Sequence, residues 1–290
     1  MTVTSQGAVQ VLTDSTSDVR QEDAERAGIT VVPAYVFFGE EEYRDGVSLG
    51  SEEFYRRLEE KTVTPKTAQP SPQDFADAFS RLAPNGPVLA LTVSSRISGT
   101  YESARMGRDM ALQDHPDAVI EVIDTLIVAM GLGDLAVRAG QKAREGMNIA
   151  ELAEWARDTA SRTRIYFAVD TLEYLARGGR IGKAQRLLGG LLSLRPVLEF
   201  RDGEVHPLQR VRSRAKAHEV LEAHAHGHGT PERLVYATTT DHQRAGEMAE
   251  RSRSRLNVDE VPLYTIGTAV GTYVGPGCIG VALVAPPGSG

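Results

Sequence analysis

The sequence of 290 residues contains one cysteine, one tryptophan and fewer basic than acidic residues. The single cysteine, Cys278, cannot form a disulfide within the chain, which excludes a disulfide-stapled scaffold and is compatible with a reducing cytoplasm. The 32 Lys and Arg residues against 39 Asp and Glu residues give a net charge of −7. Because a duplex-binding protein is expected to present a basic face, this balance disfavours nucleic acid as a partner.

Charge is missing altogether from the last 30 residues, Val261–Gly290. A membrane-spanning helix needs about 20 consecutive apolar residues, but prolines and glycines interrupt this segment, and each lowers the stability of a helix. We therefore predict a strand over Leu263–Gly267, a loop over Tyr273–Gly277 and a final buried strand. The start of the chain, Met1–Gln10, has neither the basic residues nor the long apolar stretch of a secretory signal, so we expect a cytoplasmic protein.

Short apolar runs alternate with amphipathic stretches through the first half of the chain. Val9–Thr13 and Val88–Val93 are typical of buried strands, and Ile29–Phe38 is typical of a further extended segment. The pair Ser71-Pro72 marks the start of a helix. Strands that alternate with helices predict an α/β fold with a mostly parallel sheet and helices on both faces.

The second half has a different pattern. Arg164–Val169 is typical of a strand, and Arg201-Asp202-Gly203 between two extended runs predicts a β-hairpin. A hairpin among helices requires an antiparallel pair, so we expect a mixed sheet with helices here. Two domains of about 100–200 residues each also fit the length. We predict an N-terminal, Rossmann-like α/β domain over 1–163 and a C-terminal α/β domain with the mixed sheet over 164–290.

Three patterns resemble known catalytic or ligand-binding motifs, and each has a simpler explanation. Gly46–Gly50 fits the G-x-S-x-G turn around a hydrolase serine, but the polar lead-in over Glu40–Asp45 favours an ordinary loop. His224, His226 and His228 alternate as metal ligands on a strand do, but they follow a helical pattern, which favours a solvated helix end. Two glycine patterns lack the strand-to-helix turn that a dinucleotide fingerprint needs.

The hydroxyl-rich segment Ser94–Ser103 follows a buried strand and opens a helix. Open α/β sheets bind ligands at this edge, and hydroxyls together with the free N–H groups of a helix start form a site for an anion. Without a lysine or P-loop spacing, a carboxylate fits better than a nucleotide triphosphate. Ordinary capping by serine and threonine explains the segment equally well. A second hydroxyl-rich loop, Thr64–Ser71, precedes another helix.

Six short motifs are spaced along nearly the whole chain, from Val11 to Val281. They are Thr13–Asp18; Val32-Pro33 with Phe38-Gly39 and Asp45–Val47; Thr67–Pro72; Ser94-Ser95 with Ser98–Tyr101; Leu172–Leu175 followed by Gly178–Ile181; and Arg210–Arg212 with Gly275–Gly277. Each motif alone is weak, but their order resembles the DegV family of bacterial fatty-acid-binding proteins, some of which are the acyl-binding subunit of a fatty acid kinase.

The resemblance implies a two-domain DegV-like α/β fold with one long-chain fatty acid buried in a tunnel between the domains. It places the carboxylate of that ligand against the hydroxyls of Thr67, Ser94 and Ser95, and it places Arg180 and Arg212 near the head group. It implies no catalytic residue, metal or cofactor in this chain. Besides the fatty acid, the partners that it implies are the ATP-binding subunit of a fatty acid kinase and, for lipid exchange, a transiently contacted membrane.

Two positions depart from the family pattern. Ala68 replaces a usual serine, while the neighbouring Thr67 keeps its hydroxyl. Tyr273 stands in the head-group region where many members carry histidine, and a tyrosine donates a hydrogen bond but carries no positive charge near pH 7. Two other functions stay open: a serine acyl-hydrolase or acyl-transfer enzyme with Ser48 or Ser95 as nucleophile, and a sensor of another small carboxylate.

Overall fold

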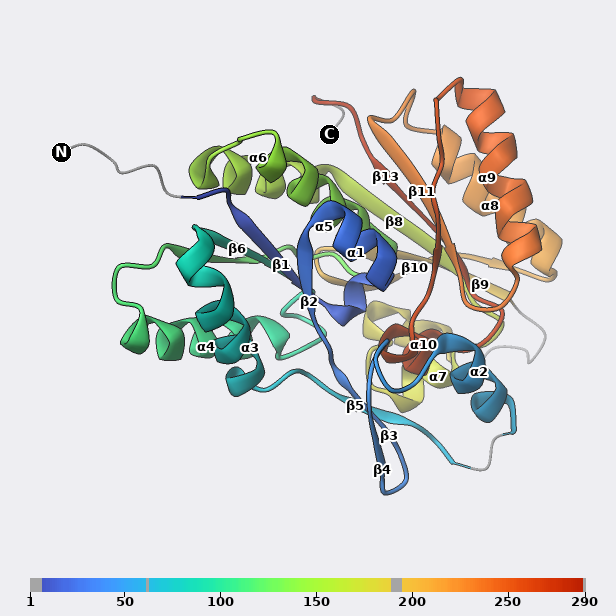
Figure 1. Cartoon of the computed structure of the whole chain (residues 1–290). Coiled ribbons are helices and arrows are strands. Elements are labelled where there is room, and N and C mark those ends of the chain that lie inside the picture. Colours follow the sequence, from blue (N-terminus) through green and yellow to red (C-terminus); the bar gives the residue numbers. More distant parts are fainter. Residues whose placement is uncertain (1–6, 61–62, 189–194, 289–290) are drawn as a thin grey trace.

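The computed structural model describes residues 7–60, 63–188 and 195–288, which form three β-sheets with helices packed between and around them (Figure 1). A four-stranded parallel sheet and a six-stranded mixed sheet lie on either side of a helical layer, and a small three-stranded sheet lies at one edge of the molecule. This arrangement confirms the predicted α/β fold, in which a parallel sheet is followed by a mixed sheet.

The four-stranded sheet has the order β2-β1-β6-β7, and its strands are all parallel. They are β1 (Gln10–Asp14), β2 (Ile29–Val32), β6 (Val88–Thr92) and β7 (Ile120–Asp124). One face is covered by α3 (Pro72–Leu82) and α4 (Thr100–Asp114), and the other by α1 (Gln21–Ala27), α5 (Ala129–Arg144) and α6 (Ile149–Arg162). Successive side chains of β1 alternate between the faces, so Val11 belongs to the core around α5 and Leu12 to the core around α3.

The six-stranded sheet has the order β10-β9-β8-β13-β11-β12. Its strands are β8 (Thr163–Ala168), β9 (Arg195–Arg201), β10 (Glu204–Val211), β11 (Arg233–Thr238), β12 (Leu263–Thr265) and β13 (Ile279–Val284). β11 and β12 run parallel, and the other neighbours are antiparallel. The outer face is covered by α8 (Arg214–His226) and α9 (His242–Leu256). The predicted hairpin is present, because Asp202 and Gly203 join β9 to β10 with φ angles of 53° and 79°, as a type I′ turn requires.

The small antiparallel sheet has the order β4-β3-β5 and consists of β3 (Tyr35–Phe38), β4 (Glu41–Arg44) and β5 (Lys66–Ala68). Helix α10 (Thr268–Val274) packs on this sheet, and α2 (Ser51–Glu60) and α7 (Glu173–Arg177) pack on α10. The described residues also contain the short 3-10 helices η1 (Ser15–Ser17), η2 (Ala83–Asn85) and η3 (Gly182–Leu187).

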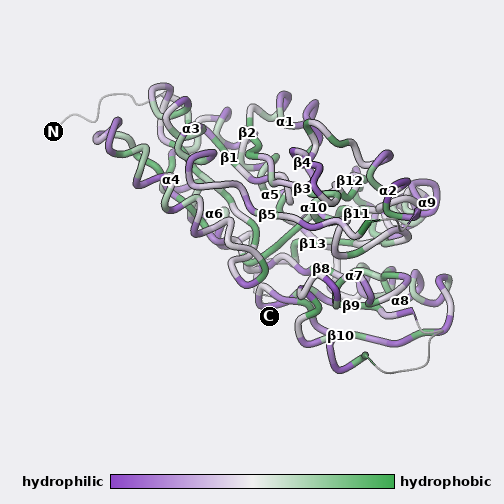
Figure 2. Tube along the Cα trace, turned by 90° about the horizontal axis from the view of Figure 1, so that it is seen from below, coloured by the Kyte–Doolittle hydropathy of each residue, from purple (hydrophilic) through white to green (hydrophobic). Residues whose placement is uncertain are grey.

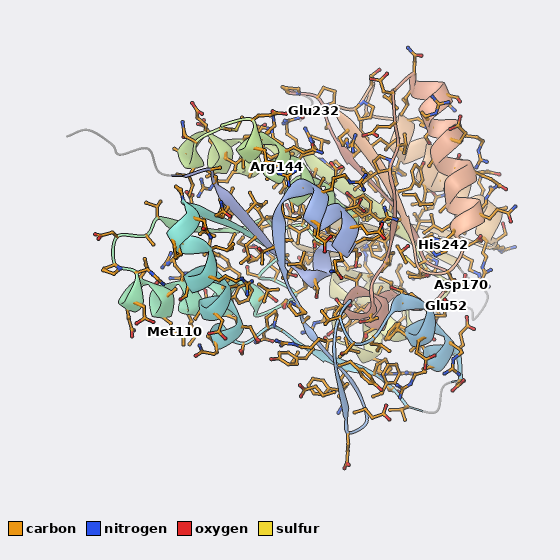
Figure 3. The ribbon with its side chains drawn as sticks, in the orientation of Figure 1. Glu52, Met110, Arg144, Asp170, Glu232 and His242 are labelled. Atoms are coloured by element: carbon orange, nitrogen blue, oxygen red, sulfur yellow. The ribbon has the colours of Figure 1, made fainter. Side chains whose placement is uncertain are left out.

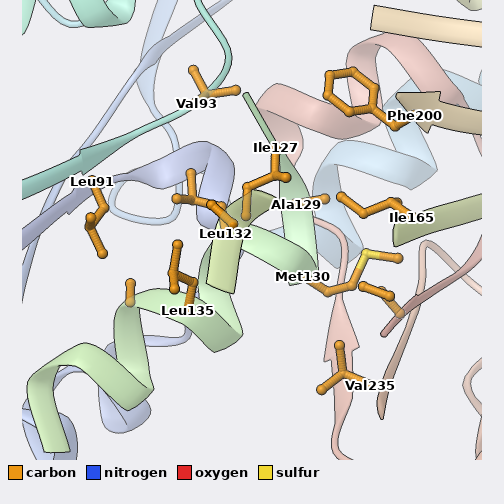
Figure 4. Close-up of a cluster of buried hydrophobic side chains, with 14 of the residues drawn as sticks. Leu91, Val93, Ile127, Ala129, Met130, Leu132, Leu135, Ile165, Phe200 and Val235 are labelled. Atoms are coloured by element: carbon orange, nitrogen blue, oxygen red, sulfur yellow. The ribbon is translucent and has the colours of Figure 1, made fainter. Parts of the chain in front are cut away.

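Helix α5 is buried on nearly all sides because it lies between the two large sheets. Its residues Met130, Leu132 and Leu135 are each no more than 2% exposed. They share one core with Leu91 of β6 and Ile165 of β8 (Figure 4). The first half of α5, Ala129–Ala136, is buried on every side, as is typical of a helix segment that lies between two sheets. Figure 2 shows the same division, with hydrophobic residues along the inner strands and hydrophilic residues mainly on the outer helices and loops.

Glu232, just before β11, ties the helical layer to the mixed sheet (Figure 3). Its carboxylate accepts hydrogen bonds from Arg138 of α5 at 2.6 Å and from Arg162 of α6 at 2.9 Å. Close by, Arg233 Nε donates to the buried Asp134 Oδ1 of α5 at 2.8 Å. The two large sheets are therefore joined by charged pairs as well as by apolar packing.

The predicted division between residues 163 and 164 falls after the first residue of β8, where the mixed sheet begins. The parallel sheet takes its strands from residues 10–124, and the mixed sheet takes its strands from residues 163–284. Helices α5 and α6 contact both sheets, so the assignment of two separate domains stays a prediction. No helix within the described ranges is long and apolar enough to cross a membrane.

The uncharged C-terminal segment contains α10 where a loop over Tyr273–Gly277 is predicted, so the prediction is wrong for the start of that range. The glycines that argue against a helix serve close packing, because a Cβ on Gly271 would lie 2.3 Å from the Tyr55 hydroxyl. The helix start is capped from a distant part of the chain, since Asp45 Oδ1 accepts from the Thr268 N–H at 3.1 Å. Local sequence carries no trace of that cap.

The predicted extended segment Ile29–Phe38 is divided between two sheets. Its first residues form β2 of the parallel sheet, and its last residues form β3 of the small sheet. Pro33 and Ala34 separate the two strands. Because proline has no N–H to donate to a strand ladder, the chain leaves one sheet at this point and enters the other.

His224, His226 and His228 are partly buried, in contrast to the predicted solvated helix end. The rings of His224 and His228 lie 4.7 and 6.1 Å from the ring of Tyr166, and His226 Nε2 lies 2.9 Å from Ser252 Oγ. These histidines therefore pack α8 against its neighbours. Over the residues that the structure describes, no group of three His, Cys, Asp or Glu side chains is placed to hold a metal ion.

Candidate functional site

A cavity of about 1000 Å³, counted with its open mouth, lies where α5, α10 and the small sheet meet the mixed sheet. Most of the wall is apolar and is formed by α5, α10 and the strands β8, β9 and β10. The polar lining residues are Thr16, Thr67, Gln69, Ser98, Thr100, Arg180, Tyr273 and Cys278. Contacts among Thr67, Tyr273 and Arg180 and between Ser98 and Thr100 bring most of these polar groups to one end of the cavity, its polar end.

Thr67 and Tyr273 form one side of the polar end of the cavity. Their hydroxyl oxygens are 2.5 Å apart, because the pairing of β5 with β3 positions Thr67 and α10 brings Tyr273 against it. The Arg180 guanidinium lies over the Tyr273 ring, with 5.1 Å between Cζ and the ring centre. Gly178 permits this packing, since a Cβ there would lie 2.3 Å from the same ring. Two hydroxyls and a cation thus converge on one spot.

The start of α4 forms the other side of the polar end. Its N-cap residue is Gly99, which has no side chain to cap the helix, and the Thr100 N–H donates to Ser98 Oγ at 3.3 Å, so the N–H groups of Tyr101 and Glu102 are the ones left for a ligand. Ser98 Oγ lies 2.8 Å from Thr100 Oγ1, and both residues line the cavity. Arg180 Nε donates to the Ile97 carbonyl at 3.0 Å, which holds the guanidinium beside this helix start. Hydroxyls, a cation and a helix N-terminus together suit a carboxylate.

The structure places Ser94 and Ser95 outside the cavity, contrary to the expected site. Ser94 is buried, and its hydroxyl donates to the Gly203 carbonyl at 2.8 Å, while Ser95 is exposed. After β6 the chain turns, with the Ser98 N–H donating to the Ser94 carbonyl, and the residues that line the cavity are Val93 before this turn and Ile97, Ser98 and Thr100 after it. The signal for Ser98 and Thr100 is present in the sequence, because both belong to the same hydroxyl-rich segment.

Of the other predicted head-group residues, three line the cavity and one does not. Thr67, Arg180 and Tyr273 line the cavity, whereas Arg212 follows β10, is exposed and does not line it. Gln69, which belongs to the Thr67–Pro72 motif but not to the predicted site, lines the cavity two residues after Thr67. The three predicted residues that do come together belong to β5, to the loop after α7 and to α10, which are far apart in the sequence.

The rest of the cavity wall is buried and apolar. Ile165 and Phe167 of β8 line it, while Tyr166 between them packs toward α8, as the alternation of a strand requires. Met130 of α5 and Phe200 of β9 extend the wall, and none of these four lining residues is more than 8% exposed. Because burial of an unpaired charge or polar group is costly, this part of the cavity suits hydrocarbon.

The cavity offers no activated nucleophile. Burial raises the pKa of Cys278, so its thiol stays protonated and unreactive. Ser48 does not line the cavity, and its hydroxyl accepts from the Arg44 N–H at 2.8 Å. Among the described residues that line the cavity, Arg180 is the one charged side chain, and there is no histidine to act as a base. The geometry therefore lacks the serine–base pair that a hydrolase needs.

Three buried carboxyl groups, those of Asp14, Asp18 and Asp45, support the wall of the cavity. Asp14 Oδ1 accepts from Thr16 Oγ1 at 2.5 Å, which orients a lining residue. Asp45 Oδ1 accepts from Thr268 N and Oγ1 at 3.1 and 2.6 Å. Asp18 Oδ1 accepts from the Gly267 N–H at 2.8 Å. Burial raises the pKa of all three carboxyl groups. Their motifs are visible in the sequence, but this supporting role is not.

The chain is similar over nearly its whole length to proteins of one family. A family model described as "Uncharacterised protein, DegV family" matches residues 8–286. A DegV domain-containing protein of Streptomyces coelicolor is 33% identical over 280 residues, which are 95% of this chain and 98% of that protein.

Solved structures show the same fold. A fatty-acid-binding DegV family protein of Thermus thermophilus is 30% identical with a TM-score of 0.83, and the match covers 96% of this chain and 100% of that one. A stearic-acid-binding protein of Eubacterium ventriosum is 28% identical with a TM-score of 0.87, and the match covers 96% of this chain and 98% of that one. The family model, the sequence relative and the solved structures agree, and the chain belongs to the DegV family.

Proposed function

We propose that the chain binds one long-chain fatty acid, with the hydrocarbon in the buried part of the cavity and the carboxylate at the polar end. The observation that carries this proposal is the division of one cavity into a buried apolar wall and a group of hydroxyls with a single cation, Arg180. A fatty acid has the same two parts. The similar proteins of Thermus thermophilus and Eubacterium ventriosum are fatty-acid-binding proteins, which supports the proposal.

The carboxylate has several donors within reach at the polar end. Between Thr67 and Tyr273, one hydroxyl donates and the other accepts, so the proton of the accepting hydroxyl stays available to a ligand. Arg180 gives Nε and Nη1 to two backbone carbonyls, and its Nη2 remains for the head group. Ser98 and the first turn of α4 complete the site. Hydrogen bonds to an ionised group are the stronger ones.

Burial of the hydrocarbon provides most of the affinity. At about 0.8 kcal/mol for each buried CH₂, a palmitoyl chain contributes roughly 12 kcal/mol, and the loss of freedom on binding offsets part of this. A ligand held in this way is expected to survive purification of the protein.

The direct test is the identity of the ligand that copurifies. Lipid extracted from the purified, denatured protein is expected to contain a long-chain fatty acid, and delipidated protein is expected to take up added palmitate or oleate. Protein that carries no fatty acid and takes up neither would contradict the proposal. Recovery of a short carboxylate in its place would support the alternative of a small-carboxylate sensor.

We further propose that the chain presents its fatty acid to a kinase and does not itself transform it. A surface pocket lined by Arg96, Gly179, Gly182 and Glu204 adjoins the polar end and shares Arg180 with it. A partner enzyme that docks there has access to the carboxylate. The partner would transfer the γ-phosphoryl group of ATP to a carboxylate oxygen, which forms an acyl phosphate and releases ADP.

Trapping of the acyl phosphate by hydroxylamine tests this second part. The loaded protein with ATP and the ATP-binding subunit of a bacterial fatty acid kinase is expected to give a hydroxamate, and either protein alone is not. The variant Tyr273→His places an imidazole, whose ordinary pKa is about 6.5, at the position where many members of the family carry histidine. A hydroxamate that forms only with this variant would contradict presentation by the native chain and leave fatty-acid binding intact.

A further inference from the structure

We propose that Met130 determines the length of the acyl chain that the cavity accepts. This inference rests on the proposed function, because it concerns the inner end of the same cavity.

The cavity has an open end and a closed end. At the polar end Gln69 and Arg180 are exposed, and Arg180 also lines the adjoining surface pocket. Met130, Ile165 and Gly280 line the cavity as well, but all three are buried, with Met130 only 2% exposed. A carboxylate held at the open end therefore directs the methyl end of the chain toward this buried group.

Met130 closes the cavity by resting on the backbone of β13. A Cβ on Gly280 would lie 2.6 Å from Met130 Cε, so the methyl group occupies the space that a side chain at position 280 would need. Glycine inside a strand marks a place where another group approaches the backbone closely. Figure 4 shows the Met130 side chain at this position beneath Ile165. The thioether chain is unbranched and flexible, so its position responds to changes in the space around it.

Behind Met130 lies a second, smaller pocket between α5 and the mixed sheet, lined by apolar residues such as Leu135 and Val235 and by the charged Asp134 and Arg233. Asp134 lies one turn further along α5 on the same face of the helix and is buried. It accepts from Arg233 Nε at 2.8 Å. Beside Met130, a Cβ on Gly131 would lie 2.8 Å from Ile165 Cδ1, so that gap is closed. A chain that passes the Met130 side chain would enter this small pocket and meet the Asp134–Arg233 ion pair there, so the Met130 side chain separates the cavity from the pocket behind it.

Two substitutions shift the closed end in opposite directions. Met130→Ala removes the three outer heavy atoms of the side chain and is expected to move the preferred ligand to a chain about two carbons longer, with about a fourfold gain in affinity for each added CH₂ that becomes buried. Gly280→Ala forces Met130 Cε away from β13 and into the cavity, and is expected to move the preference to a shorter chain. In the double variant the displaced methyl group is gone, so the effect of Gly280→Ala on chain length is expected to disappear.

The experiment loads delipidated protein with an equimolar mixture of laurate, myristate, palmitate, stearate and arachidate and reads the bound ligands by native mass spectrometry. Met248→Ala is the matched control, because Met248 is buried but does not line the cavity. It is expected to leave the distribution of bound chains unchanged. Folded Met130→Ala and Gly280→Ala variants that keep the wild-type distribution would overturn the inference. If one variant does not fold, the other tests it alone. Wild-type protein that binds none of the five acids would contradict the proposed function itself.

Discussion

At the scale of single residues, the proposed head-group site is made of neutral hydroxyls and one guanidinium. Thr67, Ser98 and Tyr273 provide the hydroxyls, and Arg180 provides the charge. An arginine is always protonated in a protein, and hydroxyls donate without a change of charge. Recognition of a carboxylate here thus depends on geometry, because the donors are held by the strand, helix and loop that carry them.

The double variant Thr67→Ala with Ser98→Ala tests the hydroxyls. Loss of two hydrogen bonds to a carboxylate is expected to weaken fatty-acid binding by at least tenfold, since each such bond contributes about 1.5–3 kcal/mol. Displacement of a fluorescent fatty acid measures the effect. Ser95→Ala is the matched control from the same hydroxyl-rich segment, because Ser95 does not line the cavity. Equal affinities for the double variant and the control would show that these two hydroxyls do not bind the carboxylate.

The pH dependence of binding tests the charge of the site. The wild-type affinity for palmitate is expected to stay constant between about pH 6 and 8, because the proposed donors are hydroxyls and a guanidinium and no histidine among the described residues lines the cavity. In the variant Tyr273→His, a protonated imidazole attracts the carboxylate. Its affinity is expected to rise as the pH falls through about 6.5. A wild-type affinity that titrates over this range would indicate an ionisable group at the head-group site.

At the scale of secondary-structure elements, two helix starts decide how the site is held. Helix α10 carries Tyr273 and is capped by Asp45, which lies after β4. Helix α3 follows the loop after Thr67 and has a capping box of Ser71 and Asp74, as the sequence predicts from Ser71-Pro72. In both cases a carboxyl group at a helix N-terminus satisfies N–H groups that the helix leaves free.

Substitution of Asp45 tests the cap of α10. Asp45→Ala removes the acceptor for the Thr268 N–H and hydroxyl, and is expected to lower the free energy of unfolding by about 1–3 kcal/mol and to weaken fatty-acid binding. Asp45→Asn keeps an oxygen acceptor and is expected to lose much less of both. Urea unfolding and ligand displacement measure the two effects. Equal losses in the two variants would show that the hydrogen bonds to Thr268 are not what holds the helix.

The pH dependence of stability tests the start of α3. Burial raises the pKa of Asp74, but hydrogen bonds from Arg44 and Ser71 outweigh it and lower the pKa from 3.8 to about 2. A lowered pKa stabilises the folded state above pH 3.8, and this stabilisation is lost as the pH falls toward 2. Asp74→Asn is therefore expected to lower the free energy of unfolding by about 2 kcal/mol at neutral pH.

Urea unfolding at several pH values measures this effect. The difference between Asp74→Asn and wild type is expected to shrink as the pH falls below about 4. The control is Asp77→Asn on the same helix, where Asp77 is exposed and accepts from Gln73. It is expected to change stability by no more than about 0.5 kcal/mol. A difference for Asp74→Asn that does not depend on pH would exclude the ionised carboxylate as its source.

At the scale of the whole molecule, the cavity draws its wall from the mixed sheet, the small sheet, helices α5 and α10, and the loop between β6 and α4. A ligand inside it therefore joins parts that are otherwise held by α5 and by charged pairs such as Arg138–Glu232. Binding to the folded state alone stabilises that state by an amount that grows with the ligand concentration.

Removal of the ligand is expected to lower the melting temperature. At a palmitate concentration about 100 times Kd the gain is about 2.7 kcal/mol, which corresponds to about 4 °C for a chain of this size. Differential scanning fluorimetry of delipidated and reloaded protein measures the shift. Equal melting temperatures with and without palmitate would contradict binding in a cavity that spans the fold.

Local patterns in the sequence determine much of this protein. Apolar periodicity predicts the α/β fold, Ser71-Pro72 predicts the start of α3, and Arg201-Asp202-Gly203 predicts the hairpin, because each depends on residues that are neighbours along the chain. The family motifs direct attention to Thr67 and Tyr273 but do not show that their oxygens are 2.5 Å apart across 206 positions of sequence.

Only the tertiary structure decides which hydroxyls face the cavity. Ser94 turns away to bond Gly203, while Ser98 lies at the polar end. The same holds for the glycine-rich segment of α10, which is helical because distant side chains cap it and fill the space beside its glycines. The physical reason is common to these cases. Hydrogen bonds and packing between segments far apart in the chain outweigh the local preferences that a sequence pattern reports.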